Sequence, residues 1–333
     1  MTDGDGIRFG YTLMSEQSGP RDLVRYAVAA ERAGFDFEVC SDHYSPWLTE
    51  QGHSPYAWSV LGAVAHATER VGLMTYVTCP TMRYHPAVVA QKAATVSLLS
   101  EGRFTLGLGS GENLNEHSVG AGWPAVETRQ EMLEEAVEII RGLFDGDLVT
   151  YRGEHFAVDS ARLWDLPEEQ VRIAVAVSGG RSVERFASLA DDLVAVEPDA
   201  ALVSAWNEVE GATRIGAGAR AIGQVPICWD PDEKAAVERA HDQFRWFGGG
   251  WDVNADLPTT AGFAGASQFV TPDDVAGSIP CGPDLDAVVD AVSEFWEAGF
   301  TDVCVVQVGD EGQDRFLEEA AGPLLEKLRA AAP

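Results

Sequence analysis

Lysine is nearly absent from this chain, which has only Lys92, Lys234 and Lys327 among its 333 residues. In total 23 Lys and Arg residues stand against 53 Asp and Glu residues, and the formal net charge is -30 at pH 7. Such a charge repels phosphate backbones and anionic lipid surfaces, so neither nucleic acid nor a membrane is an expected partner. An acidic, lysine-poor surface suits a salt-rich cytoplasm, where ions screen its self-repulsion. A GC-rich genome, which writes arginine for lysine, gives a weaker version of the same bias.

Paired cysteines and long apolar runs are also missing. The five cysteines are scattered singly, without a CxxC pair or a regular spacing, which predicts reduced thiols and neither a disulfide framework nor a metal site. No apolar run approaches the length of a membrane span, and the N-terminus has neither the basic nor the apolar region of a signal peptide. We therefore expect a soluble, cytoplasmic protein. The cysteines are Cys40, Cys79, Cys228, Cys281 and Cys304.

Short apolar, β-branched runs alternate with amphipathic stretches along the whole chain, which is typical of βα repeats around a parallel sheet. The hydrophobic content of 46% is enough to fill a barrel and a ring of helix–sheet contacts. Eight strands are predicted, and hence an α/β fold, a (β/α)8 TIM barrel that forms a single domain over residues 1–333. The predicted strands are Ile7–Met14, Phe37–Cys40, Gly72–Thr78, Phe104–Leu108, Ile173–Val177, Leu193–Val196, Gln224–Trp229 and Asp302–Val308.

Apolar residues at helical spacing predict helices between these strands. Two stretches exceed a minimal barrel: a hairpin-like insertion at Leu148–Leu166, before the fifth strand, and the Gly- and Pro-rich segment Gly248–Pro283, between strands seven and eight. Loops of this length inside a compact domain are usually lids or substrate walls. The predicted helices include Pro20–Ala33, Thr128–Phe144, Arg181–Ala190, Pro231–Phe247, Asp284–Ala298 and Gln313–Ala330.

Polar, glycine-rich or titratable residues follow five consecutive predicted strands. Because the active site of a parallel barrel lies at the C-terminal ends of its strands, these residues are expected to share one rim. After the second strand, His43 has the side chain to exchange a proton beside a redox cofactor. After the fourth, Glu112 has a carboxyl group that can reach the barrel axis as an acid or base. Each residue also has a purely structural interpretation. His43 can be an ordinary surface loop residue, Glu112 a solvated carboxylate, and Asp42 the cap of the next helix.

Two glycine motifs near the rim allow more than one interpretation. The glycines in Gly107–Gly111 permit close approach of the backbone to a planar ligand, but their spacing also resembles the nucleotide loop of a Rossmann-like methyltransferase or dehydrogenase. Three strands precede this motif, whereas a dinucleotide loop normally follows the first, which disfavours that alternative. Gly179-Gly180, before a predicted helix, form either a backbone-amide nest for a phosphate or a simple tight turn.

Taken together, the motifs resemble the luciferase-like flavin and deazaflavin oxidoreductases, and within them the deazaflavin (coenzyme F420)-dependent glucose-6-phosphate dehydrogenase group. The resemblance runs from Gly10 to about Arg185 and is weaker beyond. It implies a luciferase-like barrel and an oxidoreductase that transfers hydride between F420 and a hydroxylated small molecule. The sequence stretches that carry it are GYTLMSEQ, AAERAGFD, SDHYSPW, GHSPYAW, RYHPAVVAQ, LGLGSGENLNE, GWP and SGG.

The resemblance also implies roles for individual residues. His43 and Glu112 are the implied catalytic acid/base pair, and Trp47 and Glu16 shape the pocket and tune protonation. It further implies a non-prolyl cis peptide between Tyr76 and Val77, pressed against the cofactor ring. The residues implied to line the deazaflavin are Asp42, Tyr76, Val77, Thr78, Cys79, Ser110, Gly111 and Asn115, and its phosphate end is expected at Gly179, Gly180, Ser182 and Val183.

Departures from the family pattern bear on the substrate. Cys79 stands where the family usually has threonine, which removes one hydroxyl contact to the cofactor. Asp199 stands in place of a phosphate-binding lysine, and only small or apolar residues surround Gly277, where an arginine is expected. Because an acidic wall binds a dianionic phosphate poorly, we expect a neutral alcohol, sugar or ketone and not glucose 6-phosphate.

Two alternatives remain open at this stage. One is a flavin mononucleotide (FMN) enzyme of the same barrel, either a monooxygenase or a dehydrogenase. The other is a non-catalytic protein that stores or presents the deazaflavin. The resemblance also implies a homodimer, because barrels of this family often pair through helices.

Overall fold

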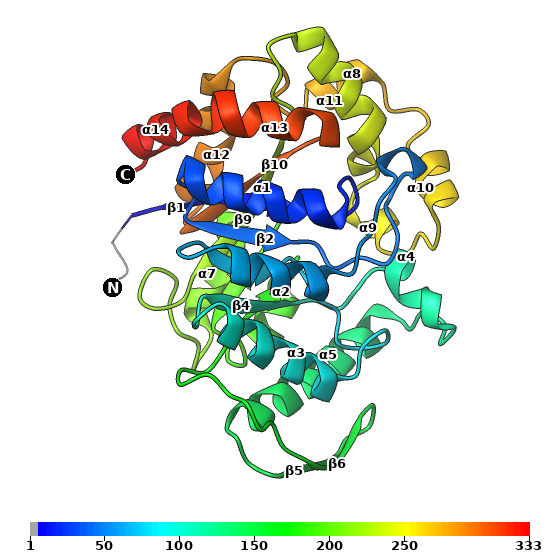
Figure 1. Cartoon of the computed structure of the whole chain (residues 1–333). Coiled ribbons are helices and arrows are strands. Elements are labelled where there is room, and N and C mark those ends of the chain that lie inside the picture. Colours follow the sequence, from blue (N-terminus) through cyan, green and yellow to red (C-terminus); the bar gives the residue numbers. More distant parts are fainter. Residues whose placement is uncertain (1–5) are drawn as a thin grey trace.

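The computed structural model describes residues 6–333 and closes eight parallel strands into a barrel (Figure 1). The strand order around the barrel is β1-β10-β9-β8-β7-β4-β3-β2. The predicted TIM-barrel fold is therefore confirmed, and each predicted strand overlaps one barrel strand. The strands are β1 (Arg8–Leu13), β2 (Phe37–Cys40), β3 (Gly72–Thr75), β4 (Phe104–Leu108), β7 (Arg172–Ala176), β8 (Asp192–Val194), β9 (Ala221–Ile227) and β10 (Asp302–Gln307).

Both faces of these strands are buried, as a parallel barrel requires. Side chains from successive strands fill the barrel interior, among them Phe37, Met74 and Cys304. The outward-facing side chains of the strands pack against the helices. The N-terminal segment on which the absence of a signal peptide was predicted begins outside the described residues. Within the described residues, no helix combines the length and apolar character needed to cross a bilayer.

Helices surround the barrel, and most predicted ones are present. The predicted helix Gln313–Ala330 is interrupted, because a π-helical segment at Phe316–Ala320 separates α13 from α14. The helices are α1 (Pro20–Ala33), α2 (Ala57–Ala67), α3 (Pro86–Leu99), α4 (Asn113–Glu116), α5 (Val126–Phe144), α6 (Gly180–Phe186), α7 (Ala200–Glu208), α8 (Glu233–Phe244), α12 (Leu285–Glu297), α13 (Gln313–Arg315) and α14 (Ala321–Ala331).

Both predicted insertions have secondary structure of their own, and the second packs onto the barrel through a shared hydrophobic cluster. The first forms an antiparallel hairpin of β5 (Val149–Arg152) and β6 (Ala157–Ala161), at the bottom of Figure 1. The second contains short helices on the side of the barrel toward which β2 points, where α4 also lies (Figure 1). It therefore borders the rim at which the site residues were predicted. Its elements are α9 (Trp251–Asn254), α10 (Thr260–Ala266) and α11 (Pro272–Ala276), and the 3-10 turn η3 (Arg245–Gly249) leads into it from α8.

Candidate active site

His43 and Glu16 form a close pair at the rim. Glu16 lies just beyond β1 and His43 just beyond β2, and these two strands are paired in parallel. The Nδ1 atom of His43 lies 2.6 Å from Oε1 of Glu16. The Glu16 side chain is fully buried, and its other oxygen accepts a 2.7 Å hydrogen bond from the hydroxyl of Ser41. One carboxylate thus orients the imidazole while a serine orients the carboxylate.

Glu112 faces the opposite nitrogen of the same imidazole. It precedes α4, beyond the end of β4, and its Oε2 atom lies 3.9 Å from Nε2 of His43. This distance is too long for a direct hydrogen bond, but an oxygen atom between the two groups can lie about 2.8 Å from each. The pair therefore leaves room for one hydroxyl or carbonyl oxygen.

Burial and neighbouring charges change the proton affinity of both groups. Burial lowers the pKa of His43, but the attraction of Glu16 and Glu112 outweighs it, so the pKa of His43 is raised above its ordinary value. Burial raises the pKa of Glu112, although His43 partly counteracts this effect. Both groups are therefore inclined to hold a proton, as expected of groups that exchange one with a bound oxygen.

Trp47 closes one side of this arrangement. Its ring meets the His43 ring edge to face, with centroids 4.5 Å apart. Trp47 also stacks on Trp246 of η3, with ring centroids 4.0 Å apart and an angle of 11° between the ring planes. The indole N–H of Trp47 is buried beside Glu112 without a well-formed hydrogen bond. The turn that leads into the second insertion thus supplies an aromatic wall beside His43.

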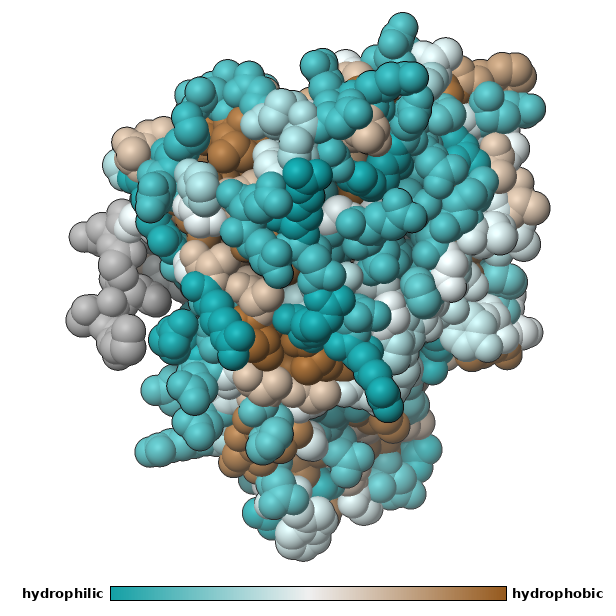
Figure 2. All heavy atoms as spheres, turned by 45° about the horizontal axis from the view of Figure 1, so that its top comes forward, coloured by the Kyte–Doolittle hydropathy of each residue, from teal (hydrophilic) through white to brown (hydrophobic). Residues whose placement is uncertain are grey.

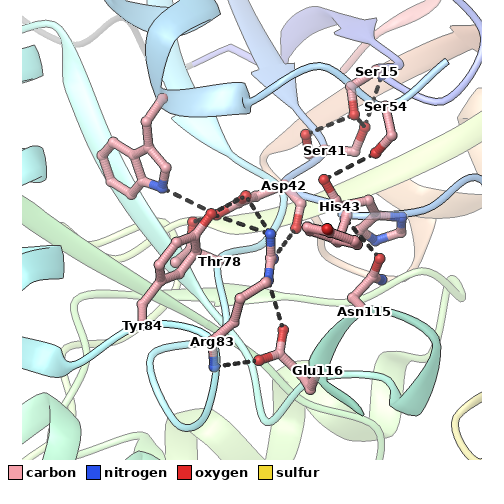
Figure 3. Close-up of polar contacts among 12 residues, drawn as sticks. Ser15, Ser41, Asp42, His43, Ser54, Thr78, Arg83, Tyr84, Asn115 and Glu116 are labelled. Atoms are coloured by element: carbon pink, nitrogen blue, oxygen red, sulfur yellow. Dashed lines mark hydrogen bonds and ion pairs between the residues drawn. The ribbon is translucent and has the colours of Figure 1, made fainter. Parts of the chain in front are cut away.

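Asp42 is the centre of a buried hydrogen-bond network (Figure 3). Its Oδ2 atom accepts hydrogen bonds from the indole of Trp58 and the hydroxyl of Thr78, and its Oδ1 atom accepts one from the hydroxyl of Tyr84. The Asp42 side chain has no exposed surface. Its carboxylate therefore accepts hydrogen bonds from other protein side chains, and the hydroxyl of Thr78 donates its hydrogen to it.

Arg83 lies beside Asp42 and joins it to Glu116 (Figure 3). The guanidinium lies within 3.4 Å of the Asp42 carboxylate and 3.3 Å of the Glu116 carboxylate, and its side chain is only 7% exposed. Next to Glu116, the amide oxygen of Asn115 accepts hydrogen bonds from the backbone N–H groups of Tyr44 and Ser45. Asn115 therefore holds the loop that carries His43.

The glycines of the Gly107–Gly111 motif have a packing role that differs from the predicted one. A Cβ atom at Gly107 would clash with the Thr75 carbonyl, one at Gly109 would lie 2.7 Å from Val77, and one at Gly111 would lie 2.6 Å from the Cys79 sulfur. Every second residue is therefore glycine because the chain after β3 presses against β4. The thiol of Cys79 lies 3.0 Å from the Thr81 hydroxyl, and Ser110 is partly exposed at the rim.

The predicted cis peptide between Tyr76 and Val77 is present. The strand β3 ends at Thr75 and not at Thr78 as predicted, although Thr78 still forms a parallel bridge with Leu108 of β4. The hydroxyl of Tyr76 donates to the carbonyl of Ala195, beyond β8. The segment after β3 thus crosses the mouth of the barrel.

Gly179 and Gly180 lie beyond β7, on the same rim. A Cβ atom built at either position meets no protein atom within 4 Å, so the backbone there is open. The hydroxyl of Ser182 donates to the Gly179 carbonyl, as does the backbone N–H of Val183, whose side chain is fully buried. Val183 therefore has no free polar group at this turn.

Four residues of the site were missed by the sequence analysis: Ser41, Arg83, Glu116 and Trp246. Arg83 lies in RYHPAVVAQ and Glu116 in LGLGSGENLNE, two stretches that carried the resemblance, but no local pattern revealed that they would pair. Trp246 falls within the predicted helix Pro231–Phe247, whereas α8 ends at Phe244 and the chain then turns toward Trp47. Only the folded arrangement brings these four residues to the rim.

The family model described as "Luciferase-like monooxygenase" matches residues 7–302, and the closed eight-stranded parallel barrel agrees with this match. The chain belongs to this family. Within it, the chain is 35% identical over 338 residues to an F420-dependent glucose-6-phosphate dehydrogenase from Amycolatopsis mediterranei, with coverage of 97% of this chain and 99% of the relative.

Two further relatives agree with this placement. A protein of the same name from Microbacterium testaceum is 38% identical over 240 residues, which cover 70% of this chain and 71% of the relative. Among solved structures, an F420-dependent secondary alcohol dehydrogenase in complex with an F420–acetone adduct is 29% identical, with a TM-score of 0.83 and coverage of 95% of this chain and 99% of that one.

Proposed function

We propose that this protein is an F420-dependent dehydrogenase or reductase acting on CH–OH groups, which moves a hydride between the deazaflavin and a small hydroxylated substrate. The observation that carries the proposal is the 3.9 Å separation between Nε2 of His43 and Oε2 of Glu112. An alcohol or carbonyl oxygen in this gap lies within hydrogen-bond reach of both groups.

The acid/base groups then divide the proton chemistry. Oxidation of an alcohol removes a hydride from carbon and a proton from oxygen, and a bound deazaflavin supplies the hydride acceptor. His43 takes the hydroxyl proton in oxidation and returns it to the carbonyl oxygen in reduction. Glu16 stabilises the imidazolium form of His43, and Glu112 forms a hydrogen bond with the same substrate oxygen. Trp47 keeps water away from this oxygen.

We assign the cofactor to the rim between β2 and β7. The open backbone at Gly179 and Gly180 fits the phosphate end, because no protein atom occupies the space in which a side chain would lie. Ser182 and Val183 shape this turn. Ser110, Gly111, Cys79 and the Tyr76–Val77 peptide line the ring site, while Asp42, Thr78 and Asn115 support it through their buried hydrogen bonds.

The charges near the rim favour a neutral substrate. Arg83 is buried in its ion pairs, and Arg245 is engaged with Glu50 at 3.0 Å. Asp199, which stands in place of a phosphate-binding lysine, caps the N-terminus of α7. The aromatic wall of Trp47 and Trp246 likewise suits an apolar alcohol. We therefore favour a small neutral alcohol, such as the secondary alcohols named for the structural relative, over glucose 6-phosphate.

A spectrophotometric screen tests this proposal. The purified protein is mixed with oxidised F420 and a panel of alcohols and sugars, with and without phosphate, at low and high salt. Neutral alcohols are expected to reduce F420, and His43→Ala is expected to lower the rate at least about 100-fold while cofactor binding persists. Reduction confined to phosphorylated sugars would contradict the neutral substrate, and reduction by none of the panel would contradict the activity. FMN in the purified protein, identified by its spectrum, would favour the flavin alternative.

We also propose a homodimer that pairs through α2 and α3. These two helices contain no Asp or Glu, in contrast to every other helix of nine or more residues in the described chain. Val88, Leu98 and Leu99 of α3 are each more than 40% exposed. Hydrophilic residues dominate the face seen in Figure 2, and hydrophobic residues gather in patches over its lower half. An acid-free face is where two copies of so acidic a chain can approach with the least repulsion.

A further inference from the structure

Arg83 connects three segments that come from three neighbouring strands. Its Nη2 atom donates to the backbone carbonyl of Asp42, beyond β2, at 2.6 Å. Its Nε atom donates to Glu116, in α4 beyond β4, and its own backbone N–H donates to the second oxygen of Glu116 at 2.9 Å. Arg83 itself follows β3. One buried side chain therefore fastens the ends of β2, β3 and β4 to one another.

The residues that flank these anchor points are the proposed acid/base pair. His43 directly follows Asp42, and the backbone N–H of Glu116 donates to the carbonyl of Glu112. A shift of either anchor therefore moves Nε2 of His43 relative to Oε2 of Glu112. Because one oxygen atom can bond to both groups only while the two contacts keep their distance and direction, the effect of Arg83 on this geometry bears on the proposed function as well as on structure.

We propose that Arg83 is a positioning residue, which holds the ends of β2, β3 and β4 in the arrangement that binds the deazaflavin ring and sets the gap between His43 and Glu112. This proposal rests on the proposed function for its cofactor. Arg83 acts through its neighbours, because its side chain is buried in protein contacts and the planar fork of the guanidinium matches them. A lysine keeps the charge but cannot make the same set of directed bonds.

The test compares Arg83→Lys with Arg103→Lys. Arg103 is a matched control because it too joins several segments, donating to the carbonyls of Val71, Ala65 and Thr68, but it precedes β4 and so lies at the opposite end of the barrel. Both variants are expected to lower Tm. Only Arg83→Lys is expected to raise the Kd for F420, by about tenfold, and to lower kcat by about 10- to 100-fold. Equal effects of the two variants on Kd would overturn the proposal.

Hydrogen exchange of the cofactor-free protein provides a readout that does not depend on activity. In Arg83→Lys, the backbone amides of Tyr44 and Ser45, which are held by Asn115, are expected to exchange faster than in the wild type. In Arg103→Lys they are expected to be unchanged. If the wild type binds no F420, the proposed function fails while this measurement still decides the role of Arg83. Unchanged exchange at Tyr44 and Ser45 in Arg83→Lys would overturn the inference in either case.

A double-mutant cycle with Glu116→Gln tests the connection itself. If Arg83 acts through Glu116, the loss of F420 affinity in the double variant is smaller than the product of the two single losses. Independent, multiplicative losses would show that Arg83 does not work through this carboxylate.

Discussion

The imidazole of His43 has a carboxylate on each side, and the two carboxylates do different work. Glu16 touches Nδ1 from the buried side and is fixed by Ser41, whereas Glu112 stands off from Nε2 on the side open to a ligand. The close partner has the larger effect on how strongly the ring holds its proton, and the distant one is where the proposed function places the substrate oxygen. The pH dependence of catalysis is therefore expected to follow Glu16.

Glu16→Gln is expected to lower the pKa of His43, because it removes the largest of the interactions that raise this pKa. Alcohol oxidation needs the neutral imidazole, so the wild-type rate should rise with pH through a value above the ordinary histidine pKa. In Glu16→Gln this rise is expected at a lower pH than in the wild type. The measurement is kcat/KM against pH, and a profile that does not move would contradict the assignment.

Outside the site, the carboxyl group of Glu38 in β2 is fully buried, and neither of its oxygens has a hydrogen-bond partner. Burial raises its pKa well above the ordinary value. The unfolded chain releases this proton at lower pH than the folded one, so wild-type stability falls as pH rises above the ordinary glutamate pKa. Glu38→Met is expected to remove this dependence and to increase the free energy of unfolding at pH 7 by about 2 kcal/mol.

Glu31 serves as the control for Glu38 in thermal unfolding. Burial pushes the pKa of Glu31 upward, but the N–H groups of Arg70, Val71 and Glu69 outweigh burial and lower it. Stability from Glu31 is therefore present above the ordinary glutamate pKa and is lost as pH falls. Glu31→Gln is expected to destabilise the protein at pH 7; the same sign of effect in both variants would refute the distinction.

At the scale of elements, the second insertion and the turn η3 that leads into it contact the loops that carry His43 and Glu112. Trp246 stacks on Trp47, and Arg245 pairs with Glu50, so the insertion is tied to the segment that carries His43. The backbone N–H of Asn113, next to Glu112, donates to the carbonyl of Ala255. The insertion thus completes the site from outside the barrel repeat.

Trp246→Ala is expected to raise the KM for a small alcohol about tenfold with a smaller change in kcat, because it removes the ring that holds Trp47 in place. Larger alcohols should become relatively better substrates. Trp164→Ala is the control, since Trp164 is 85% exposed beyond the β5–β6 hairpin and touches no site residue. Steady-state kinetics with a series of alcohols provides the measurement. If Trp246→Ala keeps the wild-type preference for alcohol chain length, Trp47 and Trp246 do not form a wall of the substrate site.

The elements also differ in how far the sequence predicts them. The barrel strands could be predicted because they are short β-branched runs, buried on both faces, and α1 because its polar and apolar faces are distinct. The helices α2 and α3 were not assigned, since AWSVLGAVAHA and PAVVAQKAATVSLL have no charged face to set the period. His43 and Glu112 were found from their positions after strands, whereas the pairing of Arg83 with Glu116 depends on loop conformations that no local pattern specifies.

At the scale of the whole molecule, the distribution of acids separates two kinds of surface. Most helices carry carboxylates outward, which keeps the chain well hydrated and repels its copies. A groove between the acid-free helices α2 and α3 is lined by Gly62, Gln91, Thr95 and Leu99, among others. This contrast gives the proposed homodimer a defined location.

Leu99→Glu is expected to shift the protein from dimer to monomer, because it places a carboxylate of each copy on the proposed contact. Light scattering at fixed protein concentration measures the mass. Leu148→Glu is the control, because Leu148 is more exposed, at 66%, and lies beside the hairpin. A monomeric wild type, or equal masses for the wild type and Leu99→Glu, would rule out pairing through this face.

The alternating glycines in and just after β4 have one further consequence. Because a Cβ atom at Gly107, Gly109 or Gly111 would press on Thr75, Val77 or Cys79, a larger residue at any of the three would displace the segment that carries the Tyr76–Val77 peptide. Carboxylates on the solvent-facing sides of the outer helices, in contrast, can change in number without altering this packing. Adaptation to the solvent and preservation of the chemistry thus draw on different parts of the same barrel.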